Sequence, residues 1–199
     1  MGRPQVHSDQ TILDAARTLV LDHGVRAATV AAIAQASGAP KGSIYHRFAS
    51  REDLLAEMWI RAVRRSQDRF IEAVSGPDPL EAAVAGALSL YDFAQREPGD
   101  ARLLAAVRRE DLVASVESAE IRHQLADLNI PLRDALRELT RRLYGKSTTA
   151  AVEQTTFAVV DLPLGGIRRH LIAASPLPRT MRDQLAAAVR AALQAEPQL

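Results

Sequence analysis

The feature that most constrains this chain is the spacing of its apolar residues, which repeats at the period of an α-helix through almost the whole length. Between Ile12 and Val20 apolar side chains recur three or four positions apart, and later segments repeat this spacing. No segment shows the alternation that is typical of a half-buried strand. The sequence is rich in alanine, and only 4% of its residues are aromatic. We therefore predict an all-α fold.

Capping residues, glycines and prolines divide this pattern into about nine helices. Ser8 and Thr29 are N-cap candidates, because their side-chain oxygens can accept the backbone N–H groups that a helix start leaves free. A long fourth helix is expected after Ser50. A long seventh helix is expected over 121–143, with a kink where Pro131 interrupts the backbone hydrogen bonding.

Composition excludes several classes of protein. Without cysteine, the 199-residue chain has no disulfide, thiolate metal site or cysteine nucleophile. Its start, MGRPQVHSDQ, lacks the apolar segment of a secretory signal, and no apolar stretch approaches the ~20 residues that span a bilayer. We expect a soluble, cytoplasmic protein with no membrane partner.

Enzyme motifs are also missing. The sequence has no Gly-rich phosphate loop, serine nucleophile elbow or nucleotide fingerprint. His123 and His170 lack the i+4 histidine of a zinc helix, and Glu117 and Glu120 lie near arginines, as on a solvated helix face. We predict no catalytic residue, no metal and no cofactor, and therefore no enzyme.

Positive charge is unevenly distributed along the chain. Residues 1–50 carry five basic and three acidic residues, whereas residues 51–199 carry 20 basic and 21 acidic ones. The N-terminal quarter is therefore mildly basic although the net charge of the chain is only +1. This imbalance is compatible with a nucleic-acid partner but does not by itself indicate one.

The segment TVAAIAQASGAPKGSIYHRFASREDLL, residues 29–55, has the pattern of a helix-turn-helix. Two short helices are joined by a tight turn at Gly38, where glycine can adopt a positive φ, and Pro40 suits the first turn of the second helix. Ile33, Ile44 and Phe48 are spaced to pack inward. The second helix then presents a cation, hydroxyls and an imidazole outward, the groups that contact phosphates and base edges in the major groove.

Residues 8–60 resemble the N-terminal domain of the TetR family of transcriptional regulators. The resemblance is carried by ILDAARTLVLDHG, TVAAIAQASGAPKGSIYHRF and ASREDLLAEMW, in this order and with this spacing. It implies a helix-turn-helix DNA-binding domain over 6–52 and a helical effector-binding and dimerisation domain over 53–199. It also implies a homodimeric regulator, a repressor, that binds double-stranded DNA at a palindromic operator.

Carried over residue by residue, the resemblance implies phosphate contacts at the N-cap of the second helix and at the start of the fourth, with operator contacts along the recognition helix. The DNA-binding residues it implies are Thr29, Pro40, Lys41, Gly42, Ser43, Tyr45, His46 and Arg51.

The C-terminal domain is expected to supply a dimer interface and a ligand pocket. The last two helices resemble the family's four-helix dimer interface, and the interface residues predicted there are Ile167, Leu171, Leu185, Val189 and Leu193. Prolines and glycines interrupt the helices near residues 98, 131 and 163, and such interruptions open packing defects where pockets form. The predicted pocket residues are Leu88, Tyr91, Leu104, Arg108, Leu128, Leu132 and Phe157, which would suit a small, largely apolar effector.

Two other functions fit the same residues. One is a helical DNA-binding protein that a protein partner controls or that nothing controls. The other is an all-α interaction protein that does not bind DNA.

Overall fold

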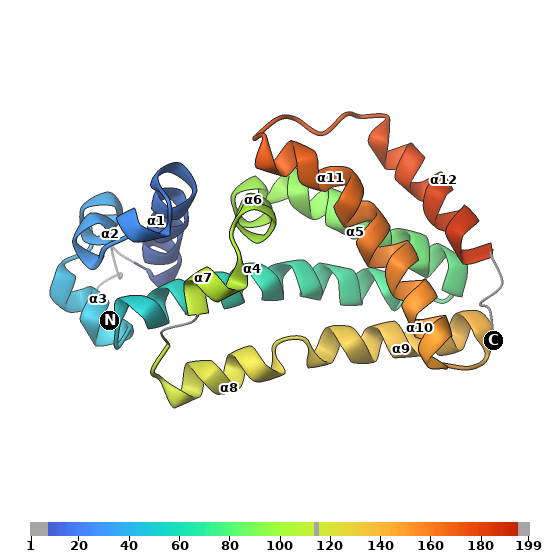
Figure 1. The fold of residues 1–199 in the computed structure, drawn as a ribbon, viewed down its shortest axis with the longest axis horizontal. Helices are drawn as coiled ribbons and strands as arrows, with labels where there is room; N and C mark the ends of the chain where they lie inside the picture. Colours follow the sequence, from blue (N-terminus) through green and yellow to red (C-terminus); the bar gives the residue numbers. More distant parts are fainter. Residues whose placement is uncertain (1–7, 114–115, 195–199) are drawn as a thin grey trace, which may run out of the picture. The chain divides into compact units, whose positions relative to one another are not determined.

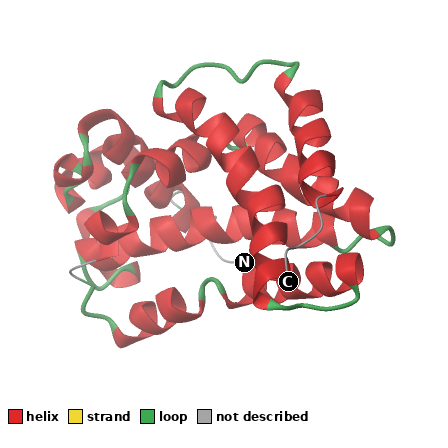
Figure 2. Cartoon of the chain, turned by 45° about the vertical axis from the view of Figure 1, so that its right-hand side comes forward, coloured by secondary structure: helices red, strands yellow, loops and turns green. Residues whose placement is uncertain are grey.

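The computed structural model describes residues 8–113 and 116–194, and all of their regular structure is helical (Figures 1 and 2). The predicted all-α fold is therefore confirmed. The elements in chain order are α1 (Asp9–His23), η1 (Val25–Ala27), α2 (Val30–Ser37), α3 (Lys41–Arg47), α4 (Arg51–Val74), α5 (Pro79–Arg96), α6 (Pro98–Ala106), α7 (Arg109–Val113), α8 (Ala119–Asp127), α9 (Ile130–Tyr144), α10 (Thr149–Thr156), η2 (Phe157–Asp161), α11 (Leu162–Ile172) and α12 (Met181–Gln194).

The chain forms two compact units. The first takes the chain up to Val63 together with Arg102–Asp127, and the second comprises Arg64–Ala101 and Leu128–Leu199. The break therefore falls inside α4 rather than at the predicted domain boundary of 52/53, and a later segment joins the N-terminal unit. Residues 6 and 7 of the predicted DNA-binding domain lie outside the described residues.

In the first unit, α1, α2 and α3 share one apolar core. Ile12 and Ile33 are fully buried, and Ile44 is 1% exposed. The predicted caps are confirmed, because the Ser8 hydroxyl accepts the backbone N–H of Thr11 at 3.2 Å and Thr29 caps α2 in the same way. Local capping and helical periodicity thus account for the packing of α3 against the rest of this three-helix core.

In the second unit, α5 is buried over most of its length and packs against α12 and α11. A methyl group on Gly86 would lie 2.5 Å from Val74, so this glycine permits the close crossing of α5 and the end of α4. Exposed arginine–carboxylate pairs flank the apolar contact between α5 and α12. Arg190 donates to Glu81, and this hydrogen bond lowers the pKa of the Glu81 carboxyl below its ordinary value.

The prediction of one continuous helix over 121–143 is wrong. The chain forms two helices there, α8 and α9, with Leu128 and Asn129 in the turn between them. Pro131 lies in the first turn of α9, where its missing N–H costs no hydrogen bond. A proline at this spacing therefore begins a new helix instead of kinking a continuous one.

The bend expected near Pro163 takes the form of a π-helical segment, η2. The Leu162 N–H donates to the Phe157 carbonyl five residues back, which widens the helix by one residue before α11 continues. Pro163 cannot donate to the carbonyl four residues back, so the local widening accommodates it. Among the residues that the structure describes, no helix is long and apolar enough to cross a membrane.

Candidate nucleic-acid interface

The predicted turn between α2 and α3 is present and is held by its own backbone. Gly38 has φ 71° in the left-handed region, as expected for the residue that ends α2. The buried Ser37 hydroxyl donates to the Ile33 carbonyl at 2.7 Å and accepts the Ala39 N–H at 3.3 Å. These bonds fix the direction in which the chain enters α3.

Helix α3 is anchored by its inward face. Ile44 and Phe48 are 1% and 3% exposed, so the predicted inward packing is confirmed. Pro40 is the N-cap residue rather than a member of the first turn as predicted, and its carbonyl accepts the Ser43 N–H at 2.9 Å. Its ring offers no side-chain cap, because it has no acceptor.

The outward face of α3 carries most of the predicted DNA-contacting residues. Lys41, Gly42, Tyr45 and His46 are exposed, as Pro40 is, and Ser43 is half-buried. The Tyr45 side chain is 56% exposed, so its ring and hydroxyl are accessible to a partner. Within the described part of the chain, Lys41 makes no ion pair or hydrogen bond that would occupy its ammonium group.

Thr29 lies at the start of α2 with its side chain exposed. Its hydroxyl oxygen accepts the Ala32 N–H at 3.1 Å and so caps the helix. A hydroxyl that accepts one hydrogen bond still has its own proton to donate. Thr29 is therefore able to donate to an anionic oxygen without giving up its role as N-cap.

Gly42 has no structural reason within the chain to be a glycine. A methyl group built on it meets nothing within 4 Å, and its backbone is helical, whereas glycine weakens a helix by about 0.5–1 kcal/mol relative to alanine. We therefore expect Gly42 to allow an external surface to come close to the backbone of α3.

We predict that Gly42→Ala raises the free energy of unfolding by up to about 1 kcal/mol. The same methyl group should weaken DNA binding by about tenfold, because it keeps α3 from its closest approach and costs at least one contact of about 1–3 kcal/mol. Chemical denaturation and fluorescence anisotropy on labelled duplex measure the two effects. Wild-type DNA affinity in this variant would contradict a close approach at Gly42.

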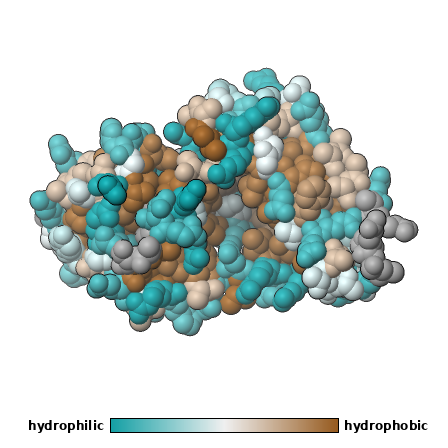
Figure 3. Space-filling model, in the orientation of Figure 1, coloured by the Kyte–Doolittle hydropathy of each residue, from teal (hydrophilic) through white to brown (hydrophobic). Residues whose placement is uncertain are grey.

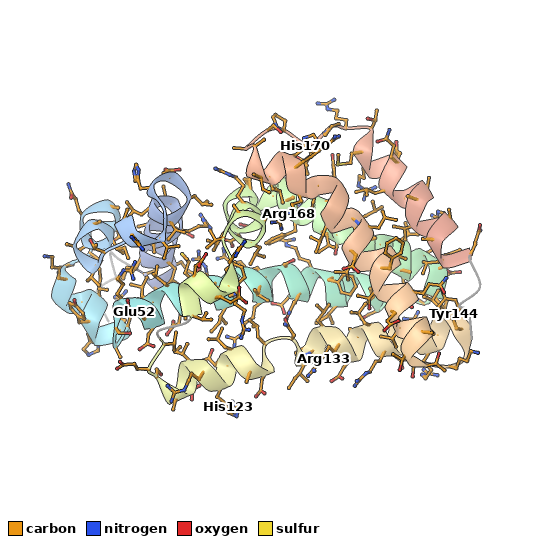
Figure 4. The ribbon with its side chains drawn as sticks, viewed as in Figure 1. Glu52, His123, Arg133, Tyr144, Arg168 and His170 are labelled. Atoms are coloured by element: carbon orange, nitrogen blue, oxygen red, sulfur yellow. The ribbon has the colours of Figure 1, made fainter. Side chains whose placement is uncertain are left out.

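Three arginines of the first unit make contacts inside it. Arg47 pairs with Asp9 at 3.1 Å, and Arg61 pairs with Asp14 at 2.7 Å. Arg51, predicted as a phosphate contact, donates to backbone carbonyls of the first unit and pairs with Glu52, which Figure 4 labels. The sequence contained no signal for the pairs that Arg47 and Arg61 make, because their partners lie 38 and 47 residues away.

The predicted pocket residues are divided between the two units. Leu104 and Arg108 belong to the first, with Leu104 half-buried and Arg108 exposed. The other five lie in the second unit: Leu88, Tyr91 and Leu128 are buried, Leu132 is half-buried and Phe157 is 54% exposed. The Tyr91 hydroxyl accepts from Gln95 at 3.0 Å and donates to the Pro178 carbonyl at 3.3 Å. A common pocket for these residues stays a prediction.

The five residues predicted for the dimer interface are buried within the single chain. Their exposed fractions run from 0% to 8%, and they pack inside the second unit; they are Ile167, Leu171, Leu185, Val189 and Leu193. The apolar stripe that the sequence shows on these helices is their core-facing side. These five side chains are therefore covered by their own chain, and their place in a dimer interface stays a prediction.

The exposed apolar residues of η2 and α11 form what we call the outer face. It consists of Phe157, Leu164 and Ile172, which are 54%, 43% and 54% exposed. Leu164 and Ile172 lie eight residues apart on α11, with the exposed Arg168 between them (Figure 4). Figure 3 shows apolar surface among polar residues in the region of α11 and α12.

Together, the packed turn between α2 and α3 and the polar outward face of α3 define a helix-turn-helix domain, which is followed by a larger helical unit. The comparisons then name the family: residues 12–58 match "Bacterial regulatory proteins, tetR family", and the resemblance inferred from the sequence is confirmed. The N-terminal domain of this chain is of the TetR type.

Curated relatives match the chain over this part only. The transcriptional repressor AcnR of Corynebacterium efficiens is 35% identical over 74 residues, which are 37% of this chain and 37% of AcnR. The transcriptional repressor KstR2 of Rhodococcus jostii is 47% identical over 47 residues, 24% of this chain and 23% of KstR2. The matching segment spans 37% of AcnR and 23% of KstR2, and both relatives are named as transcriptional repressors.

Solved structures share the fold over nearly the whole chain. FadR, a fatty acid degradation regulator from Bacillus halodurans, has a TM-score of 0.72 at 16% identity and covers 95% of this chain and 100% of its own. PfmR from Thermus thermophilus has a TM-score of 0.69 at 21% identity, and the match covers 92% of this chain and 97% of PfmR. AibR, solved with isovaleryl coenzyme A and operator DNA, has a TM-score of 0.67 at 16% identity. The match covers 92% of this chain and 95% of AibR.

Proposed function

We propose that this protein is a transcriptional repressor that binds a palindromic operator as a homodimer and releases it when a small, largely apolar effector binds. The observation that carries the proposal is the outward face of α3, where exposed polar and aromatic side chains stand on a helix whose other face is buried. The curated relatives that match this part of the chain are named as repressors. DNA is found in the cytoplasm of a bacterium, and we place the protein there.

DNA binding uses two kinds of contact in this proposal. Thr29 donates its hydroxyl proton to a phosphate oxygen, and Lys41 neutralises a neighbouring phosphate, which together set the position of the unit on the duplex. Tyr45, His46 and Ser43 then face base edges in the major groove. The backbone at Gly42 allows α3 to come close enough for these contacts.

The homodimer is proposed to form through the outer face. Gly165 lies inside α11 and is exposed, and a methyl group built on it would have no neighbour within 4 Å. Because this position has no side chain, the backbone of another helix could approach α11 closely here. Leu164 and Ile172 flank this point with exposed apolar surface. A two-fold dimer places its recognition helices in successive major grooves about 34–36 Å apart, which requires an inverted repeat in the operator.

The effector is proposed to bind in the C-terminal part of the chain. The helical interruptions at Pro131 and at η2 and the mostly apolar side chains predicted around them favour an apolar or amphipathic molecule. AibR has been solved with isovaleryl coenzyme A, and FadR is named for fatty acid degradation; both share only the fold with this chain. An effector acts by binding more tightly to the conformation that binds the operator poorly.

Selection of duplexes from a random library by the purified chain tests the proposal. We expect an enriched inverted repeat, with half-sites one helical turn apart and displacement by members of an apolar ligand panel. Enrichment that no ligand reverses would favour the helical DNA-binding protein that a protein partner or nothing controls. Absence of binding to any duplex would favour an interaction protein that does not bind DNA.

A further inference from the structure

The Arg51 guanidinium joins two distant segments of the first unit. Its Nε donates to the Ala28 carbonyl at 2.8 Å, and one terminal nitrogen donates to the Val25 carbonyl. The other terminal nitrogen bonds the Glu52 carboxylate at 3.0 Å. The side chain is 26% exposed, so most of it lies within the unit.

The two carbonyls belong to the turn that leads into α2. Val25 begins η1, and Ala28 directly precedes Thr29, whose own N–H donates to the Ala27 carbonyl at 2.8 Å. Arg51 is the first residue of α4 and follows α3 closely. One guanidinium therefore connects the entry of the helix-turn-helix to the chain just after its exit.

We infer that Arg51 is a positioning residue for DNA binding, which holds Thr29 and the start of α2 in place, and that it does not neutralise a phosphate. This inference rests on the proposed DNA binding. The planar guanidinium can bridge two carbonyls at fixed directions, whereas an ammonium group is a single compact charge. Glu52 next to it also cancels the positive charge that a phosphate would meet.

Lys41 has the opposite environment. It is exposed on α3 and has no carboxylate partner in the described part of the chain. Of these two residues implied as cationic DNA contacts, Lys41 therefore carries the charge that affects salt dependence. Arg51 affects binding through the geometry of Thr29.

Salt dependence distinguishes the two roles, because log K falls with log salt concentration by about 0.9 for every phosphate contact made by a cation. The probe is a duplex selected by the wild-type chain, and the variants are Arg51→Lys, Arg51→Gln and Lys41→Gln. We expect both Arg51 variants to lose about tenfold or more in affinity, the size of a lost charge-assisted hydrogen bond, with the wild-type slope. Lys41→Gln should instead lower the slope by about 0.9 per contact.

Full affinity in Arg51→Lys together with a reduced slope in Arg51→Gln would show a phosphate contact and overturn the inference. Wild-type affinity of the folded fraction in both variants, with only a lower unfolding temperature, would reduce Arg51 to a structural residue and also overturn it. If Arg51→Gln fails to fold, Arg51→Lys carries the test. A wild-type chain that selects no duplex would contradict the proposed function itself.

Discussion

Replacing Tyr45 by alanine is expected to abolish selective binding to the operator. A tyrosine at the centre of an interface typically contributes about 2 kcal/mol or more on truncation, and a dimer loses the contact twice, so the affinity should fall by about 10³-fold. Fluorescence anisotropy on selected duplex and on random duplex separates the loss of selective binding from the loss of all binding.

The fold should not suffer from this change. Because Tyr45 is 56% exposed, its removal opens no cavity, and the free energy of unfolding should stay within about 0.5 kcal/mol of wild type. Lys41→Ala should weaken binding to every duplex and lower the salt slope, and Arg133→Ala is its matched control. Arg133 is an exposed cation on α9, labelled in Figure 4, so its loss should leave the slope unchanged. Wild-type operator binding by Tyr45→Ala and Lys41→Ala would refute α3 as the recognition helix.

Replacing Leu164 by aspartate is expected to convert the proposed homodimer into monomers. In a two-fold interface each substitution occurs twice, and two carboxylates would be buried without partners at a cost of several kcal/mol. Leu164 is 43% exposed in the single chain, so the monomer itself should fold as before. Sedimentation equilibrium measures the dissociation of the dimer. Affinity for the operator should fall as well, because a monomer contacts only one half-site.

Ile130→Asp is the matched control for this prediction. Ile130 is also an exposed aliphatic residue, 38% exposed, but it begins α9 and is not part of the outer face. This variant should stay a dimer with wild-type affinity for the operator. A dimeric Leu164→Asp chain would place the interface elsewhere on the molecule.

The helix-turn-helix was the part of the candidate site most accessible from sequence. Its inward residues Ile33, Ile44 and Phe48, the turn at Gly38 and the cap at Thr29 lie within 20 residues of one another, and the structure confirms each of them. Helical periodicity and capping depend on residues a few positions apart, so the amino-acid sequence contains the information needed to predict these features.

The sequence did not show in the same way which surface covers the apolar stripes of α11 and α12. Val189 and Ile167 lie on amphipathic helices, and the spacing that predicts burial does not state whether the covering surface comes from the same chain or a second copy. The structure buries both residues inside one chain and leaves Leu164 and Ile172 outside. Only the packing of α11 and α12 on α5 decides which side of each helix is buried within the chain and which side stays exposed.

The sequence by itself determined the helical class, the helix-turn-helix and its outward residues, because these depend on local spacing and on turn chemistry. The tertiary structure decided which charges remain available, since Arg51 reaches carbonyls 23 and 26 residues earlier while Lys41 stays exposed. It also decided that the helix pattern breaks before Pro131. Contacts between residues far apart in the chain depend on the folded path of the backbone, which local periodicity does not specify.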